Sequence, residues 1–346
     1  MELALRDDEI APLHERLEGW IAGLQLVALS LRQHREGHED LVISGRHRFI
    51  ADYLSADVLA GLPEDVRRFL LQTSILERLC GASCDAVTNG DGGQAMLETL
   101  EREGLFLVAL DDSREWFRYH RLFGDFLRDE LRRQAPDQLR ELHRRAARWH
   151  LDRDLPEDAF RHGVAAEDVE TVIHILDLYI GPKLFAGEVR VVEGWLGSAP
   201  EAWFRSHPML GLAQATYLLI TGAFDAANGW IDRVERELAG TPGEDRQGQL
   251  AKVAMLRCAV ACFRNQLDQA EVYADQALRD LPDDDRMYRA DTYHALGDTY
   301  SRNGRWDEAR ACLRKTLEFK DDPASRLRSA HVYGALADLE LRQGRL

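Results

Sequence analysis

Apolar side chains near the start of the chain recur at intervals of three or four residues. Between positions 9 and 35 this spacing predicts one amphipathic helix. A polar stretch separates it from a second predicted helix at 49–60, and a third opens at Leu62-Pro63, with proline and acids in its first turn. The apolar positions of the first helix are Ile10, Leu13, Leu17, Trp20, Leu24, Val27 and Leu31.

A β-hairpin is predicted shortly after these helices. Leu105–Leu110 is a run of mainly apolar residues, a polar turn follows at 111–114, and Trp116–Tyr119 returns as the second strand. Short helices before a two-stranded hairpin are the arrangement of a winged helix. A long helical run from Leu122 to Asp152, interrupted near Pro136, leads out of it.

The C-terminal half repeats one short pattern four times. Copies begin at Gly222, Asn265, Gly304 and Gly344, at offsets of 43, 39 and 40 residues. In each full copy a small residue ends one helix, an apolar residue packs at the corner, and an acid is expected to cap the next helix. Such a period indicates stacked helix pairs, which provide a surface for binding rather than an active site.

The third unit resembles a tetratricopeptide repeat (TPR) most closely, and the second and first match less fully. We therefore expect a helical repeat array from about Pro208 to the end, and a similar motif at 154–159 would allow a start near residue 140. The last unit has a first helix at 328–343 and no second one, so we expect the chain to be cut from a longer protein. The matching positions are Tyr293, Leu296, Gly297, Tyr300, Gly304, Trp306 and Ala309.

Composition agrees with a helical protein of the cytoplasm. The 346 residues are 45% hydrophobic and 30% charged, apolar stretches such as Leu24–Leu31 are too short to span a membrane, and the N-terminus is too acidic for a secretory signal. We predict a mainly α fold: a helical domain plus a winged helix with a small β-hairpin wing, then a TPR-like α-solenoid. The expected boundaries are 1–60, 61–135, 136–207 (linker or start of the solenoid) and 208–346.

Neither charge nor motifs point to an enzyme, a metal site or direct DNA binding. The net charge is −16, and the arginines between Arg128 and Arg153 are interleaved with acids, as on a solvated helix. Five widely spaced cysteines suggest reduced thiols, and neither Cys80 with Cys84 nor Cys258 with Cys262 has a second ligand pair beside it. No catalytic residues are assigned, and DNA binding by the winged helix would require a basic face around Arg114, Arg118 and Arg121.

Six ordered segments resemble landmarks of one family, the MalT-like branch of the large ATP-dependent LuxR-type transcription regulators, which belong to the STAND signal-transduction ATPases. The resemblance is collinear over the chain. It is carried by Glu18–Leu26, Phe49–Leu54, Phe69–Leu76, Leu105–Val108, Phe117–Phe123 and Leu142–Trp149.

The resemblance implies ATP or ADP as cofactor, but much of the nucleotide site does not carry over. Such regulators begin with a P-loop ATPase core and end in a DNA-binding helix-turn-helix. This sequence has no G-x-x-x-x-G-K-[ST] and nothing beyond the repeats. Two positions match nucleotide contacts of the family: Ile21, where a proline usually lies against adenine, and His120, where a histidine often meets the β-phosphate of ADP. A helix cap or a core hydrogen bond is the alternative for His120.

The groove of the repeats is the predicted contact surface. TPR-like arrays line it with fixed positions on each first helix, and their mixed charge suits a small polar effector or a peptide of an inhibitory partner. Alternatively, they are only exposed faces of stacked helices. The positions are Lys252, Met255, Asp291, His294, Asp298, His331 and Asp338.

These observations predict the switch and effector-sensing portion of a MalT-like regulator. Effector binding in the solenoid would release an ADP-locked resting state. DNA would be bound only through a missing C-terminal domain, self-association is implied by the family alone, and no membrane partner is expected. The alternative is a stand-alone TPR adaptor that binds other proteins without nucleotide or DNA.

Overall fold

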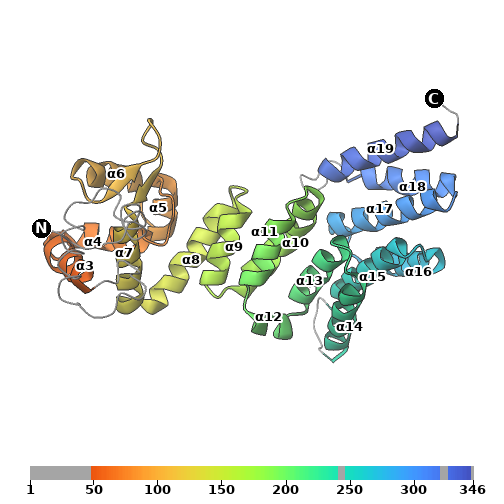
Figure 1. Ribbon diagram of the computed structural model, residues 1–346, viewed down its shortest axis with the longest axis horizontal. Coiled ribbons are helices and arrows are strands. Elements are labelled where there is room, and N and C mark those ends of the chain that lie inside the picture. The colour runs from red at the N-terminus through yellow and green to blue at the C-terminus, as the bar shows by residue number, and fades with distance from the viewer. Residues whose placement is uncertain (1–47, 241–245, 320–325, 344–346) are drawn as a thin grey trace, which may run out of the picture. The chain divides into compact units, whose positions relative to one another are not determined.

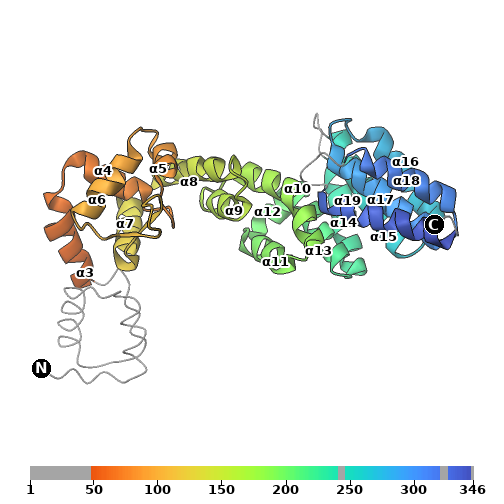
Figure 2. The ribbon, with the colours of Figure 1, turned by 90° about the horizontal axis from the view of Figure 1, so that it is seen from above.

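The computed structural model describes residues 48–240, 246–319 and 326–343, and the chain divides into two compact units at Asp168/Val169. Both units are built mainly of helices, and the described strands form one two-stranded sheet in the first unit (Figures 1 and 2). The mainly α fold with a small β wing is therefore confirmed. The predicted helix at 9–35, including Ile21, lies outside the described residues.

The first unit contains short helices, the hairpin and two longer helices. Two irregular turns, a π-helical one at Leu54–Val58 and a 3-10 one at Leu59–Gly61, continue the first of these helices. Its elements are α3 (Arg48–Tyr53), α4 (Glu64–Thr73), α5 (Gly81–Thr88), α6 (Gly93–Arg102), β1 (Leu107–Ala109), β2 (Phe117–Tyr119), α7 (Arg121–Gln134), α8 (Pro136–Leu151) and α9 (Pro156–Ala165).

The hairpin is antiparallel, with Val108 opposite Arg118. It is shorter than predicted because Phe106 adopts a left-handed φ of 53°, which ends the extended run before β1. The same residue fixes the start of α7, since its carbonyl accepts the His120 backbone N–H at 2.7 Å. Leu79 adds an isolated bridge to Phe117, so the wing is tied to the segment after α4.

One hydrophobic core joins α4, α5, α6 and β2 to α7 and α8. Leu70, Leu79, Leu97, Phe117 and Leu127 are fully buried in it. A hydrogen bond of 2.6 Å between the Thr73 and Tyr119 hydroxyls satisfies these two polar groups inside the core. The predicted break near Pro136 is confirmed: α7 ends at Gln134, and proline begins α8, where its missing N–H costs nothing.

The second unit is a series of helices arranged largely as antiparallel pairs (Figure 1). Three pairs, α13/α14, α15/α16 and α17/α18, correspond to the units predicted from the sequence. Its elements are α10 (Val169–Phe185), α11 (Val189–Ser198), α12 (Glu201–Ser206), α13 (Pro208–Ile220), α14 (Phe224–Gly240), α15 (Arg246–Phe263), α16 (Leu267–Asp280), α17 (Arg286–Arg302), α18 (Trp306–Leu317) and α19 (Arg326–Arg342).

The repeated sequence pattern marks the corner of each pair. Gly222, Asn265 and Gly304 have left-handed φ values of 85°, 56° and 73°, a conformation that glycine and asparagine adopt most readily. The expectation that an acid caps the following helix is wrong. Gln266 and Arg305 occupy two of the cap positions, and their side chains form no capping hydrogen bond. The acids lie in the first turn of each helix instead, where their negative charge interacts favourably with the positive end of the helix dipole.

Small residues allow the paired helices to approach closely. At Gly297 on α17, an added Cβ would lie 2.9 Å from Cγ of Leu313 on α18, which is fully buried. This contact explains the small residue at the TPR-like position. Asp154, in the α8/α9 corner of the first unit, also has a left-handed φ of 57°, so the motif at 154–159 forms a corner of the same kind.

Candidate functional site

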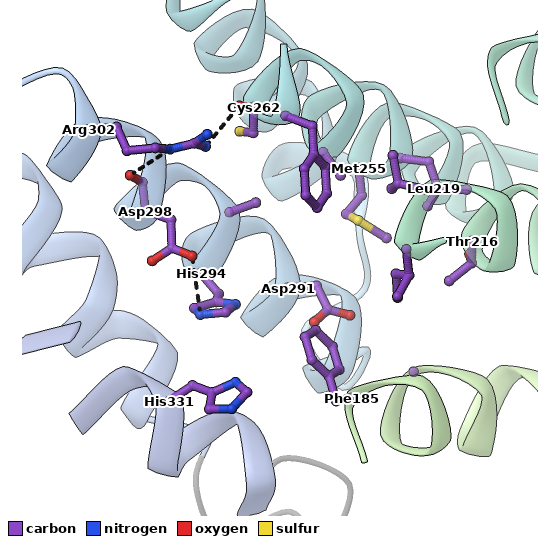
Figure 3. A pocket seen from close by; sticks show the side chains of 16 residues that line it. Phe185, Thr216, Leu219, Met255, Cys262, Asp291, His294, Asp298, Arg302 and His331 are labelled. Atoms are coloured by element: carbon purple, nitrogen blue, oxygen red, sulfur yellow. Dashed lines mark hydrogen bonds and ion pairs between the residues drawn. The ribbon is translucent and has the colours of Figure 1, made fainter. Parts of the chain in front are cut away.

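A cavity of about 360 Å³ opens within the second unit. Five helices contribute to it, α10, α13, α15, α17 and α19, so the cavity spans several repeats rather than one (Figure 3). The described residues that line it are Gly181, Phe185, Thr216, Leu219, Ile220, Met255, Leu256, Ala259, Cys262, Phe263, Asp291, His294, Ala295, Asp298, Arg302 and His331.

One side of the cavity is apolar. Leu219 on α13 and Met255 on α15 are nearly fully buried, and Phe185 at the end of α10 is half-buried. Thr216 lies on the same side, and its hydroxyl is already used, because it donates to the Leu212 carbonyl at 2.9 Å. This side therefore offers a ligand a hydrophobic surface and no charge.

The opposite side carries the charged and titratable groups of α17. Asp291, His294 and Asp298 follow one another at intervals of three and four residues, so they share one face of the helix and point into the cavity (Figure 3). His294 Nε2 lies 3.7 Å from Asp298 Oδ2, and the His294 ring contacts the Phe185 ring edge to face, at 6.4 Å between centroids. The site thus combines carboxylates, imidazoles and an aromatic ring.

Arg302 marks one end of this polar face, with its guanidinium held by neutral acceptors. It donates to the Cys262 carbonyl at 2.9 Å and to the Thr299 hydroxyl at 3.1 Å. Cys262 in turn lies 3.9 Å from Cys258, and both thiols are buried. The contact with Cys262, together with burial, raises the pKa of the Cys258 thiol, so Cys258 acts as a protonated packing group.

Five of the seven predicted groove residues line the cavity: Met255, Asp291, His294, Asp298 and His331. Asp338 does not, since it is exposed on α19 and pairs with Arg342 at 2.6 Å. Whether an effector contacts any of these side chains stays a prediction.

Lys252, the remaining groove residue, is held in an ionic cluster beside the cavity. Its ammonium lies 3.0 Å from both Asp177 carboxylate oxygens and 3.5 Å from Asp285, and it stands 4.4 Å from the centre of the Tyr288 ring. The Tyr288 hydroxyl donates to Asp177 at 2.9 Å. Burial raises the pKa of Asp285. The Lys252 ammonium lowers it in part, and the nearby Asp177 carboxylate raises it again.

Sequence reasoning missed the contributions of α10 and α13. Phe185 lies before the clear repeat units, and Thr216 lies in the weakest copy of the repeat. Neither residue belongs to a recognisable motif. No signal along the chain marks them, since only packing against α15 and α17 brings them to the cavity. Arg302 was available from the spacing, one turn beyond Asp298.

His120, the predicted nucleotide contact, is 7% exposed at the start of α7. Its ring meets Phe106 edge to face, at 6.3 Å between centroids. One buried histidine does not form a phosphate site, and the sequence lacks the P-loop that would supply backbone donors. The described residues therefore do not fit ADP.

No group of three or more histidine, cysteine or acidic side chains is placed to hold a metal ion within the part of the chain that the structure describes. Among the same residues, no helix is long and apolar enough to cross a membrane.

Comparison with known proteins connects both units to one family. Residues 55–139 match the MalT winged helix domain, and residues 249–322 match the tetratricopeptide repeat. The HTH-type transcriptional regulator MalT of Cronobacter sakazakii is 34% identical over 275 residues, which are 78% of this chain and 30% of that protein. MalT of Klebsiella pneumoniae is 33% identical over 278 residues, covering 80% and 30% of the two chains.

The chain is MalT-like over most of its length. It spans about a third of the length of these MalT relatives. The fold agrees with a crystal structure of a Signal Transduction ATPase with Numerous Domains (STAND) protein with a tetratricopeptide repeat sensor from Pyrococcus horikoshii. That likeness has a TM-score of 0.70 at 16% identity, over 99% of this chain and 49% of the other. A MalT-type winged helix followed by TPR-like repeats is thus the organisation of the chain.

Proposed function

We propose that this chain is the switch and effector-sensing portion of a MalT-type regulator of transcription, and that the cavity of its second unit receives a small effector. The observation that carries the proposal is the cavity itself, which five helices of the second unit line. Its 360 Å³ is within the size range of ligand pockets, and its mainly apolar lining with a few convergent polar groups is typical of them.

The position of the cavity gives the effector a means to act. A ligand that contacts α10, α13, α15, α17 and α19 at once stabilises one arrangement of these helices over others. Binding would therefore shift the population of solenoid conformations, and the rest of the regulator would respond to that shift. In a bacterial cell this takes place in the cytoplasm, with DNA bound by a different segment.

A screen that makes no assumption about the effector tests this function. The low-molecular-mass fraction of bacterial extracts should raise the melting temperature of the chain. The increase should be lost in Thr216→Phe, which places a larger side chain in the cavity, and retained in the matched control Thr221→Phe, which is exposed at the end of the same helix. If only the macromolecular fraction stabilises the chain, the chain is an adaptor that binds other proteins rather than a sensor of a small effector.

Nucleotide dependence is proposed for the regulator as a whole, with release of an ADP-locked resting state as its output. For this chain alone, calorimetric titration should give no saturable heat with ADP or ATP, because His120 is buried and no phosphate-binding loop is present. Saturable heat that disappears in His120→Ala would contradict this expectation and assign part of a nucleotide site to the winged-helix unit.

A further inference from the structure

Small residues on three helices leave room in the cavity. Gly181 on α10, Ala259 on α15 and Ala295 on α17 all line it. A Cβ built at Gly181 would lie 3.9 Å from the Met287 sulfur, an ordinary contact, so the packing of the helices does not itself require glycine there. Because side chains normally fill the space between packed helices, the roughly 360 Å³ left open at these positions is room for a ligand.

The rest of the lining is largely apolar and partly open to water. Leu219, Met255 and Leu256 form a buried wall on α13 and α15, and Ile220 is half-buried beside them. Phe263, the last residue of α15, is 53% exposed. Covering such apolar surface with carbon removes it from water, which is favourable in proportion to the area covered.

The charged side chains of the lining already interact with the chain or with solvent. Asp291 and His294 each interact with another group of the chain, and His294 Nε2 also lies 3.7 Å from Asp298. Asp298 has 49% of its side chain accessible, and His331 is exposed, so water solvates both. Arg302 donates to two neutral acceptors of the chain. These contacts leave a ligand little to gain from carrying a charge of its own.

Such a lining selects against charged and strongly polar ligands. An ion that enters the cavity loses part of its hydration, and lining groups that already have partners do not replace it. A molecule rich in hydroxyl groups meets the same penalty, because the Thr216 hydroxyl is also engaged, as a donor to the Leu212 carbonyl. An apolar molecule loses nothing of this kind and gains the covered surface.

We infer that the effector of this cavity is an uncharged, mainly apolar small molecule whose body covers Ile220, Met255 and Phe263. The inference rests on the proposed sensor function, because it names the chemical class of the ligand for the same cavity. Cations, anions and polyhydroxylated molecules are the alternatives that the experiments separate.

Three probes with the same phenyl body and different head groups test the charge of the ligand: 3-phenylpropanol, 3-phenylpropylamine and 3-phenylpropanoate. Calorimetry on the purified chain at neutral pH should show the alcohol binding about tenfold more tightly than either ion, because only the ions must be dehydrated without compensation. In the series benzyl alcohol, 2-phenylethanol and 3-phenylpropanol, the affinity should rise about fourfold with each added methylene, as expected for burial in an apolar site.

Variants locate this binding in the cavity. Phe263→Ser removes apolar surface at the cavity and should weaken the alcohol by about three- to tenfold. Val272→Ser is the matched control, because Val272 is 66% exposed on α16 and does not line the cavity, and it should leave the affinity unchanged. Thr216→Phe should abolish binding of the alcohol while Thr221→Phe retains it, which keeps the test decisive if Phe263→Ser fails to fold.

The natural effector can be classified without knowing its identity. The low-molecular-mass extract fraction that raises the melting temperature should lose this activity to ethyl acetate, and to the same extent at about pH 3, pH 7 and pH 11, because an uncharged molecule does not titrate. An amine would enter the organic phase only at high pH and a carboxylic acid only at low pH. A polyhydroxylated molecule would stay in water throughout.

Two outcomes overturn the ligand class and leave the sensor function standing. One is an extract activity that stays in water or changes phase with pH. The other is an ionic probe that binds as tightly as the alcohol and loses this binding in Thr216→Phe. If the alcohol gives no saturable heat, the apolar class is also wrong. An extract without any stabilising small molecule would instead overturn the sensor function itself.

Discussion

At the scale of single residues, the corner positions were the most predictable feature of this chain. The recurrence of Gly222, Asn265 and Gly304 indicated where helices end, and each residue adopts a left-handed φ. This conformation excludes most side chains, so it leaves a visible mark on the sequence. The groups that line the cavity leave no such mark, because a leucine or a phenylalanine suits many packed positions equally well.

Replacing Gly222 by alanine isolates the effect of backbone conformation. No atom lies within 4 Å of a Cβ built there, so the expected loss of about 1–2 kcal/mol in unfolding free energy comes from the left-handed φ of 85° alone. Gly229, in the middle of α14 with equally open space, is the matched control. There alanine should stabilise the chain by up to about 1 kcal/mol. Urea unfolding of both variants checks the difference in sign, and the same sign for both would contradict the argument.

At the scale of elements, proline and glycine signals located helix ends well. The length of the strands and the side chains that meet between helices depend on contacts between distant segments. Pro136 marked the boundary between α7 and α8, as predicted. The first strand was predicted too long because hydrophobicity alone does not reveal the left-handed turn at Phe106. The motif at 154–159 indicated a corner between α8 and α9, but nothing in the sequence indicated that three histidines, placed seven and twelve residues apart, would meet there.

His143, His150 and His162 lie in contact between α8 and α9. The Nδ1 atoms of His143 and His162 are 2.8 Å apart, and the rings of His150 and His162 stack at 5.3 Å between centroids, with a tilt of 11°. The charged groups around them are Arg132, Arg153, Asp158 and Arg161. Burial, and then Arg161, lowers the pKa of His143 to about 4 and that of His162 to about 2. The folded cluster is therefore neutral.

This cluster predicts that acid weakens the α8/α9 pair. The unfolded histidines bind protons below about pH 6.5 and the folded ones do not, so stability is present at neutral pH and falls as the pH drops. Between pH 7 and pH 5 the loss should be about 2 kcal/mol each for His143 and His162, and His150 should add to it in the same direction. Hydrogen exchange of the α8 and α9 amides measures it. His162→Phe should reduce the pH dependence, while His174→Gln, on the exposed face of α10, should not. Equal pH dependence in all three proteins would contradict the argument.

At the scale of the whole molecule, repeats and family resemblance together identified the architecture, since both depend on local patterns that recur in order. The cavity required more than these patterns. Five of its residues come from positions that the TPR spacing selects, but α10 and α13 join them only through packing against helices that follow much later in the sequence. The sequence therefore indicated a contact surface, and the shape of the cavity followed only from the arrangement of the helices.

Lys252 connects α10 to the later repeats through Asp177, Asp285 and Tyr288, so it should stabilise the second unit as a whole. Lys252→Met removes the cation and leaves two neighbouring carboxylates. We expect a loss of about 1–3 kcal/mol in unfolding free energy at pH 7, toward the lower end because Asp177 is 28% exposed. Without the lysine, the pKa of Asp285 rises further above its unfolded value, so the loss should shrink as the pH falls and this carboxyl takes up a proton.

Urea unfolding at pH 7 and pH 5 measures both the size and the pH dependence of this effect. Lys315→Met is the matched control, because Lys315 is 54% exposed on α18 and forms an ion pair with the exposed Glu318. Its cost should be small at either pH. A loss of the same size in both variants would show that Lys252 stabilises only its own helix. Faster amide exchange throughout α10 in Lys252→Met, and not in Lys315→Met, would show that the Lys252 ammonium holds the helices around the cavity together.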